Sequence, residues 1–248
     1  MSEAIHKLII TGTGRAGTTF LVQLLTGMGL DTGYSGGRRK DDYFEHCSAG
    51  LERGIFDEGS PYIVKDPRLC ETLPVLLATE RLVVDHAIVA VRDLEDAARS
   101  RIRIGGRNGD VPGGLLWTDD PAAQKGVLAE HFHLLIHTLV ANDIPHTLLH
   151  FPRFATDAAY AQAKLGFLAP ALGLPEFREI FATVSRPELI HQFGPEADRE
   201  AGRAAAQFMA AHQRKRRRRR LRRVAFVLGA VAVGVAAVRM IAERTVAQ

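Results

Sequence analysis

The fold of this 248-residue chain is decided by KLIITGTGRAGTTFLVQLLTGMG, residues 7–29. Residues 7–11 are mostly apolar or β-branched, which predicts a short buried strand that ends at the first glycine of the stretch. After the glycines, apolar side chains recur at helical spacing from Phe20 to Met28. Gly29 is a typical residue at the end of a helix. The stretch therefore predicts a strand, a glycine-rich loop and a helix, in that order.

The loop at residues 12–19, GTGRAGTT, is typical of an anion-binding turn. Free N–H groups and the helix dipole favour an anion at the start of a helix, and glycines allow the backbone to approach it closely. Compared with the GxxxxGK[ST] pattern of nucleotide hydrolases, Thr18 stands at the lysine position and Thr19 fills the hydroxyl position. The missing lysine argues against ATP or GTP hydrolysis, and Arg15 supplies a cation instead. The alternative is a tight turn without a ligand.

Strands and helices alternate along the rest of the chain. Strands are predicted at 62–65, 86–91 and 146–151, and helices at 71–83, 94–104, 121–141 and 157–183, the last with a break at 173–175. Such alternation predicts parallel strands joined by right-handed crossovers, with helices on both faces of the sheet. The predicted fold class is therefore α/β in three layers.

The stretch GTGRAGTTFLVQLL, residues 12–25, resembles the 5′-phosphosulfate loop of bacterial-type sulfotransferases. These enzymes take the sulfuryl group from 3′-phosphoadenosine 5′-phosphosulfate (PAPS), and they share the P-loop fold without the hydrolase lysine. The resemblance implies a P-loop NTPase-like fold with a central parallel sheet. It also implies that the 5′-phosphosulfate is held by Gly14, Arg15, Gly17, Thr18 and Thr19.

A second match lies in RDLEDAARS, residues 92–100, which follows a predicted strand. It is similar to the VRDPxxxxxS pattern with which sulfotransferases hold the 3′-phosphate of the donor, except that Leu94 replaces the proline. The resemblance implies that Arg92 and Ser100 hold this phosphate. A guanidinium can bind two phosphate oxygens and a hydroxyl can donate a third hydrogen bond. For Arg92 alone, the simpler interpretation is a surface ion pair with a neighbouring carboxylate.

The segment IVKDPRL, residues 63–69, resembles the part of the family fold where a Lys or His approaches the reacting sulfuryl group. It implies that Lys65 stabilises charge on the bridging oxygen of the donor, with Asp66 or Arg68 facing the acceptor. The alternative is a strand end followed by an Asp-Pro turn with solvated charges.

The general base is sought in RRKDDYFEHC, residues 38–47, because some family members use a glutamate shortly after the first loop. Glu45 is our first candidate, followed by Asp42 and His46. A carboxylate there serves a hydroxyl acceptor if partial burial raises its pKa toward neutrality. The alternative is that these acidic residues favour the start of a helix.

The net charge of +4 is unevenly distributed. Residues 214–223 carry nine positive charges and residues 224–248 a net one more, which leaves −6 for residues 1–213. The body of the protein is therefore a poor generic binder of nucleic acid. Two cysteines are too few for a disulfide framework. We assign no metal, because His133 and His137 lack the HExxH pattern of zinc-binding helices.

The end of the sequence predicts a membrane anchor. The uncharged residues 224–238 span roughly 22 Å as a helix, and residues 224–242 roughly 28 Å, close to the ~30 Å core of a bilayer. The preceding arginines predict that the body faces the cytoplasm and that they contact anionic headgroups. A self-associating helix and a nucleic-acid contact by the arginines are the alternatives. The predicted organisation is a P-loop domain at 1–190, a helical connection at 191–213, the basic run at 214–223 and a single membrane helix at 224–242.

The sequence thus predicts a membrane-tethered, PAPS-dependent sulfotransferase that acts on a small-molecule, glycan or lipid acceptor, most readily through a hydroxyl. A homo-oligomer is compatible with it. Two alternatives stay open: a P-loop kinase of small molecules, and a non-catalytic tethered protein that binds nucleotide.

Overall fold

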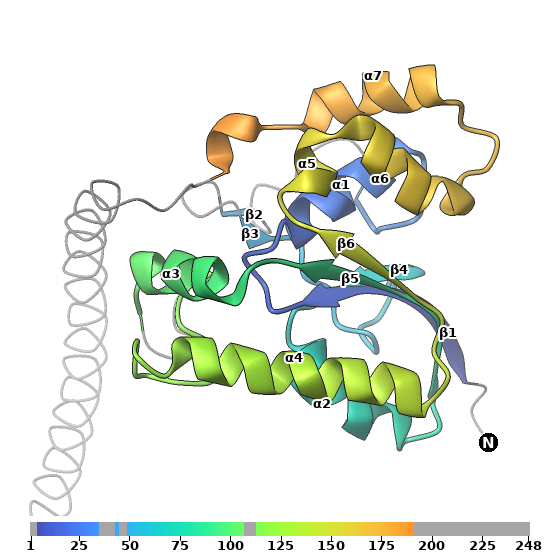
Figure 1. Cartoon of the computed structure of the whole chain (residues 1–248). Coiled ribbons are helices and arrows are strands. Elements are labelled where there is room, and N and C mark those ends of the chain that lie inside the picture. Colours follow the sequence, from blue (N-terminus) through green and yellow to red (C-terminus); the bar gives the residue numbers. More distant parts are fainter. Residues whose placement is uncertain (1–3, 35–42, 45–48, 107–112, 191–248) are drawn as a thin grey trace, which may run out of the picture. The chain divides into compact units, whose positions relative to one another are not determined.

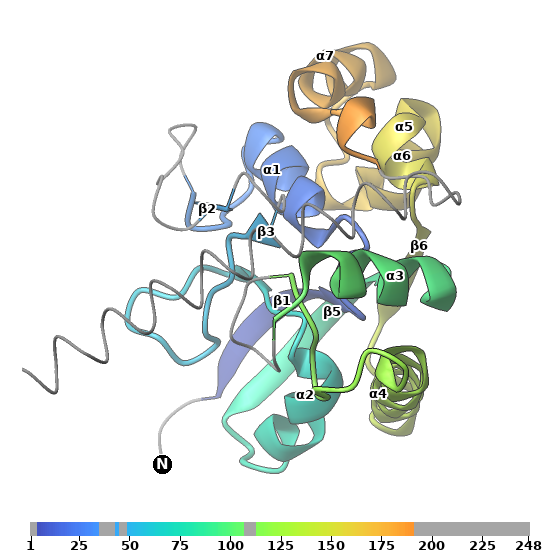
Figure 2. The ribbon, with the colours of Figure 1, turned by 90° about the vertical axis from the view of Figure 1, so that its left-hand side faces the viewer.

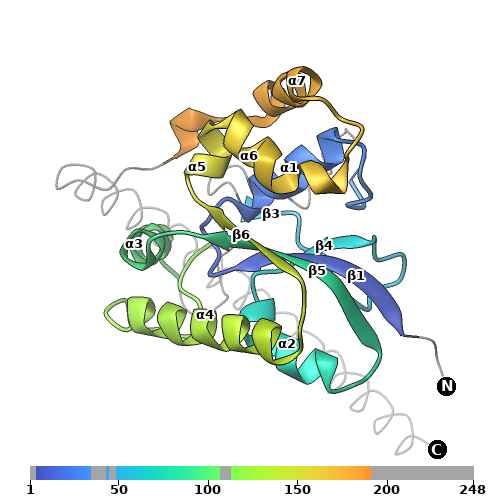
Figure 3. The same ribbon diagram turned by 45° about the vertical axis from the view of Figure 1, so that its right-hand side comes forward.

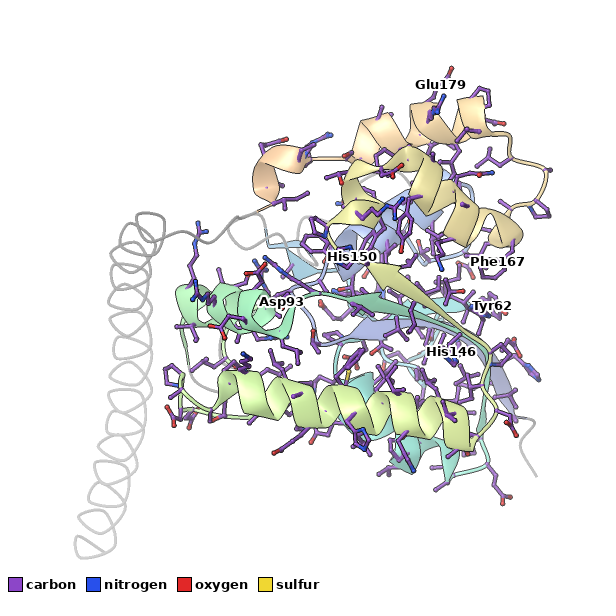
Figure 4. The ribbon with its side chains drawn as sticks, viewed as in Figure 1. Tyr62, Asp93, His146, His150, Phe167 and Glu179 are labelled. Atoms are coloured by element: carbon purple, nitrogen blue, oxygen red, sulfur yellow. The ribbon has the colours of Figure 1, made fainter. Side chains whose placement is uncertain are left out.

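Four parallel strands form the central sheet, in the order β4-β1-β5-β6. The computed structural model describes residues 4–34, 43–44, 49–106 and 113–190. The strands of the sheet are β1 (Ile5–Gly12), β4 (Ile63–Lys65), β5 (Leu82–Val91) and β6 (His146–His150), and a separate antiparallel pair joins β2 (Tyr43–Phe44) to β3 (Ala49–Gly50). Figure 4 shows the common strand direction, with Tyr62 and His146 at the amino edge and Asp93 and His150 at the carboxyl edge.

Helices cover both faces of the sheet (Figures 1 and 3). On one face lie α1 (Thr18–Gly27), α5 (Arg153–Thr156), α6 (Ala158–Leu165) and α7 (Leu174–Val184). On the other lie α2 (Leu69–Leu77) and α4 (Gln124–Ala141). From the carboxyl end of β5 the chain continues into α3 (Leu94–Ile104), which packs against α4. Two short 3₁₀ helices, Gly166–Leu168 and Pro187–Leu189, complete the described elements.

The central strand β1 shows why the sheet needs both helical layers. Leu8 and Ile10 pack into one buried cluster with α1, α6 and α7, whereas Ile9 packs into a second cluster with α2 and α4. Successive side chains of a strand point to opposite faces, so an entirely apolar strand requires cover on both sides. The predicted α/β class with a central parallel sheet and flanking helices is therefore confirmed.

The boundaries of three predicted helices were wrong. The helix predicted at 71–83 ends at Leu77, and the chain enters β5 at Leu82, where alternating burial is typical of a strand. The helix predicted at 121–141 begins only at Gln124. The segment predicted at 157–183 has its predicted break at Gly173, which precedes α7, but α6 already ends at Leu165. In contrast, the helix predicted at 94–104 is α3.

The predicted connection at 191–213, the basic run and the membrane helix lie outside the described residues. Contacts divide the chain into two units, Met1–Asp198 and Arg199–Gln248, and every described residue belongs to the first. Within the described ranges, no helix is long and apolar enough to cross a bilayer.

Candidate anion-binding site

The glycine loop lies at the carboxyl edge of the sheet, where the strand order reverses direction. After β1 the chain adds β4 on one side of it, and then β5 and β6 on the other. In open α/β sheets, ligands bind beyond the carboxyl ends of the strands at such a switch point. Figure 2 looks onto this edge, with α1, α3 and β3 around the end of β1. The topology thus places the predicted loop where a ligand is expected.

The loop adopts a conformation that requires glycine. Gly17 precedes α1 with a φ of 77°, and a Cβ on it would lie 2.7 Å from a ring carbon of Phe151. Arg15 is also in the left-handed region, with a φ of 54°. The N-cap residue Gly17 has no side chain to cap α1, and the first turn of this helix contains no acidic residue. The positive end of the helix dipole is therefore left for another group to balance.

The two predicted phosphate-binding motifs meet in the structure. Arg15 Nε donates to the Ser100 hydroxyl at 3.0 Å, although 85 residues separate them. Arg92 Nη1 donates to the backbone carbonyl oxygen of Arg15 at 2.8 Å, and the guanidinium lies 5.0 Å from the centre of the Phe151 ring. Burial lowers the pKa of Arg92, whereas Asp96 and Asp93 oppose that shift. The loop, the end of β5 and α3 thus form one cluster.

Lys65, the predicted catalytic lysine, is only 3% exposed and reaches the first turn of α1. Its Nζ donates to Gly50 O at 2.7 Å, to Thr19 Oγ1 at 3.3 Å and to Glu52 Oε1 at 2.5 Å. Burial lowers the pKa of this lysine, and the Glu52 carboxylate is the strongest opposing influence. Thr18, the other predicted loop threonine, begins α1 and is buried.

Glu52 is a site residue that sequence reasoning missed. Its side chain is 43% exposed while its carboxylate binds the buried Lys65. The predicted bases Glu45, Asp42 and His46 lie outside the described residues. Glu52 follows β3 and carries no motif, so only its contact with Lys65 identifies it.

Arg101 is the second residue that sequence reasoning missed. It is 3% exposed, and its Nη1 and Nη2 donate to Gly114 O at 2.7 Å and to Thr13 O at 2.8 Å. Its Nε is buried without a hydrogen-bond partner. Burial, and secondarily the charge of Arg15, lowers the pKa of Arg101 to about 9, so that it remains charged at neutral pH. A signal was available, because Arg101 lies four residues after Ala97 on the buried face of α3.

Two buried cations at this edge, Lys65 and Arg101, differ in their partners among the described residues. Lys65 is paired with Glu52, and Arg101 forms no ion pair with any described residue. Buried charges are costly unless they are paired. A bound anion would supply the missing negative charge, and the arrangement can offer it guanidinium, ammonium, hydroxyl and backbone N–H donors.

The described residues contain no group of three or more His, Cys, Asp or Glu side chains that could hold a metal ion. His133 and His137 lie with their rings 6.3 Å apart on α4, and His131 stacks on Trp117 with ring centres 3.9 Å apart.

Fold and site together define an α/β protein that presents a cationic glycine loop at the carboxyl edge of a parallel sheet. In comparisons with protein-family models, curated proteins and solved structures, nothing matches this chain.

Proposed function

We propose that the protein is a PAPS-dependent sulfotransferase of the P-loop class. The observation that carries the proposal is the contact of Arg15 with Ser100 and Arg92, which joins the two predicted phosphate sites in one cluster. PAPS carries anionic groups at both the 5′ and the 3′ position of its ribose, so one molecule needs two such sites close together. A tight turn without a ligand has no need of contacts with a buried arginine after β5 and a buried serine on α3.

The donor fits the groups present. The 5′-phosphosulfate would occupy the loop before α1, where Arg15 and the N–H groups around Gly17 supply hydrogen bonds. The 3′-phosphate would lie between Arg92 and Ser100. In the structure Ser100 accepts a hydrogen bond from Arg15, which leaves its own hydroxyl hydrogen to be donated to a phosphate oxygen.

Sulfuryl transfer would proceed by direct displacement. The acceptor hydroxyl oxygen forms a bond to sulfur while the bond from sulfur to the bridging oxygen breaks, and its electron pair remains on the departing 3′-phosphoadenosine 5′-phosphate (PAP). By analogy with phosphoryl transfer, such a step depends mainly on positioning and on charge stabilisation. Lys65 would stabilise the charge that develops on the bridging oxygen.

The acceptor proton needs a base, and Glu52 is the described carboxylate best placed for it. It is in contact with Lys65, while its partial exposure gives an acceptor access. Glu45 remains the candidate suggested by the family resemblance. Separate Glu52→Gln and Glu45→Gln variants distinguish them, because only loss of the base should abolish transfer while PAP binding is retained.

Calorimetric titration with PAP tests the proposal. We expect micromolar binding that Arg15→Ala or Arg92→Ala weakens at least ~10-fold, because each removes a charge-assisted hydrogen bond. Arg99→Ala is the matched control, since Arg99 lies on α3 but pairs with Glu95 at the surface.

Equal affinity for ATP together with a magnesium requirement would contradict the proposal and favour a small-molecule kinase. The contact of Lys65 with Thr19 is the observation that favours the kinase as a second candidate function. It places a lysine next to the loop, although Thr18 occupies the lysine position of the loop itself.

We also propose that residues 214–242 tether the enzyme to the cytoplasmic face of a membrane, on the strength of the basic run next to an apolar segment. The full-length protein should sediment with membranes after carbonate extraction, and deletion of residues 214–248 should release it. A full-length protein found in the supernatant would contradict the tether.

A further inference from the structure

One buried side chain joins two segments of the site, residues 12–17 and residues 113–116. We infer that Arg101 is a positioning residue that links these segments, so that anion binding at the glycine loop and the ordering of residues 113–116 depend on each other. The inference rests on the proposed function only for the identity of the anion.

The guanidinium of Arg101 is in direct contact with the backbone of the loop. Its two terminal nitrogens bind the carbonyl oxygens of Thr13 and Gly114, one in each segment. A Cβ on Gly14 would lie 2.2 Å from Arg101 Nη2, so the loop is in close contact with the guanidinium. Any movement of the loop away from this position breaks the link between the two segments.

The bond to Thr13 also orients a donor of the loop. The peptide unit between Thr13 and Gly14 is planar and trans, so its C=O and N–H groups point in opposite directions. Because Arg101 holds the carbonyl oxygen, the N–H of Gly14 is turned to the side of the loop away from Arg101. An anion on that side would find this N–H already oriented, which lowers the cost of binding.

The segment 113–116 begins next to the side chain of Arg15. A Cβ on Gly113 would lie 3.1 Å from Arg15 Nη1, which places this backbone against the guanidinium. At its other end, Leu116 exchanges two hydrogen bonds with the buried side chain of Gln124, at 2.9 and 3.0 Å. The segment is therefore held at Gly114 by the anion site and at Leu116 by α4.

Electrostatics couples the two segments further. Among the described residues, Arg101 contacts carbonyl oxygens but no carboxylate, and its Nε has no hydrogen-bond partner. The nearby charge of Arg15 repels that of Arg101. An anion bound between the loop and Arg15 would attract both cations and offset their mutual repulsion. Binding should therefore tighten the contacts of Arg101, and with them the segment 113–116.

Hydrogen exchange of the full-length protein with and without PAP tests the inference. In the wild type, PAP should slow exchange of the amides at 113–116 by at least ~5-fold, in addition to those of the loop. In Arg101→Gln, PAP should bind at least ~10-fold more weakly and leave exchange at 113–116 unchanged. Arg101→Lys, which retains the charge but not the two-pronged geometry, should recover part of the affinity and none of the coupling.

The outcomes separate the inference from the proposed function. If the wild type binds PAP but hydrogen exchange at 113–116 does not change, the inference is overturned and the proposed function is not. This measurement uses the wild type only, so it does not depend on the folding of a variant. Slowed exchange with inorganic pyrophosphate, but no binding of PAP, overturns the sulfotransferase assignment and retains the inference. Wild-type affinity and wild-type coupling in Arg101→Gln would also overturn the role of Arg101.

Discussion

Each end of the sheet holds a buried lysine, and the two differ in what they contact. At the amino edge, Lys7 is 6% exposed and its Nζ donates to the carbonyl oxygens of Ser60 and Pro61, at 2.9 and 2.6 Å. At the carboxyl edge, Lys65 shares its donors between a backbone carbonyl, the hydroxyl of Thr19 and a carboxylate. Burial lowers the pKa of both.

The difference shows that burial of a charge does not by itself identify a functional residue. Lys7 donates to two backbone carbonyl oxygens, of Ser60 and Pro61, which no reaction rearranges. Lys65 binds the side chain of Thr19 at the beginning of α1 and that of Glu52 after β3, next to a loop with further cations. The surroundings of Lys65 therefore allow it to exchange a hydrogen-bond partner when a substrate binds.

The largest effect expected from this comparison is on catalysis. Lys65→Met should lower the rate of sulfuryl transfer about 100-fold or more, because it removes a donor to the charge that develops in the transition state. Lys7→Met should leave the rate unchanged and reduce the free energy of unfolding by about 1–3 kcal/mol, because two buried carbonyls lose their donor. Transfer of label from radiolabelled PAPS to acceptors in a cell extract measures the first quantity, and urea denaturation the second. Equal losses of transfer in both variants would contradict the distinction.

The two ends of α1 can also be compared, through glycines with similar φ values. Gly17 and Gly29 have φ values of 77° and 81°, but a Cβ would meet Phe151 at Gly17 and nothing within 4 Å at Gly29. Both alanine variants should lose about 1–2 kcal/mol of stability from the left-handed conformation. Gly17→Ala should lose about 1–3 kcal/mol more from the clash, together with PAP binding. Urea denaturation and PAP titration measure the pair, and similar stabilities would show that Phe151 does not confine the loop.

A third, smaller effect concerns the thiol beneath the loop. Cys70 donates to Gly12 O at 3.1 Å, and burial raises its pKa to about 12 from an ordinary value of 9.0. Below pH 9 both the folded and unfolded states hold the proton. Above it only the unfolded state releases the proton, so the free energy of unfolding falls as pH rises toward 12.

In a Cys47→Ser background, stability should fall from pH 8 to pH 10 by about 1 kcal/mol more with Cys70 than with Cys70→Ala. Urea denaturation at the two pH values measures the difference. Parallel losses in the two proteins would show that the thiol ionises as readily when folded as when unfolded.

The smallest effect is expected at the amino edge. His6 Nδ1 lies 2.7 Å from Asp85, and Tyr62 donates to the same carboxylate at 2.9 Å, but His6 is mostly exposed. His6→Gln should change the free energy of unfolding by less than about 1 kcal/mol and leave PAP affinity unaltered, because exposed pairs contribute little. Thermal denaturation and PAP titration of the same sample check both expectations. A change in PAP affinity would show that the two edges are coupled.

The sequence predicted those elements whose signals are local. The apolar run and glycines of residues 7–19 predicted the central strand and the loop, and the helical pattern of residues 94–104 predicted α3. The end of α2 was not predictable in the same way, because the apolar residues before and after Arg81 continue a helical pattern as readily as they begin a strand. Pairing of β5 with β1, a long-range contact, decides between the two.

The same distinction between local signals and long-range contacts applies to the residues of the candidate site. Arg15, Arg92 and Ser100 belong to motifs with fixed spacing, so their positions could be predicted, and the structure brings them together. Glu52 and Arg101 belong to no motif. Their roles in the site follow from contacts with Lys65, 13 residues from Glu52, and with Thr13, 88 residues from Arg101. A charged residue on an otherwise buried helical face was the one local signal, and it pointed to Arg101.

Phe151 has a consequence for the order in which the protein matures during its synthesis. Its ring is in contact with both Gly17 and Arg92, and its N–H donates to Val91 O at 2.7 Å, yet it follows the last strand of the sheet. A ribosome that has released residues 1–120 has delivered the glycine loop and Arg92, but not the ring over which the Arg92 guanidinium lies. We therefore expect a chain truncated at residue 120 to retain no PAP, so that a nascent polypeptide gains its affinity for nucleotide only after β6 has emerged and joined the sheet.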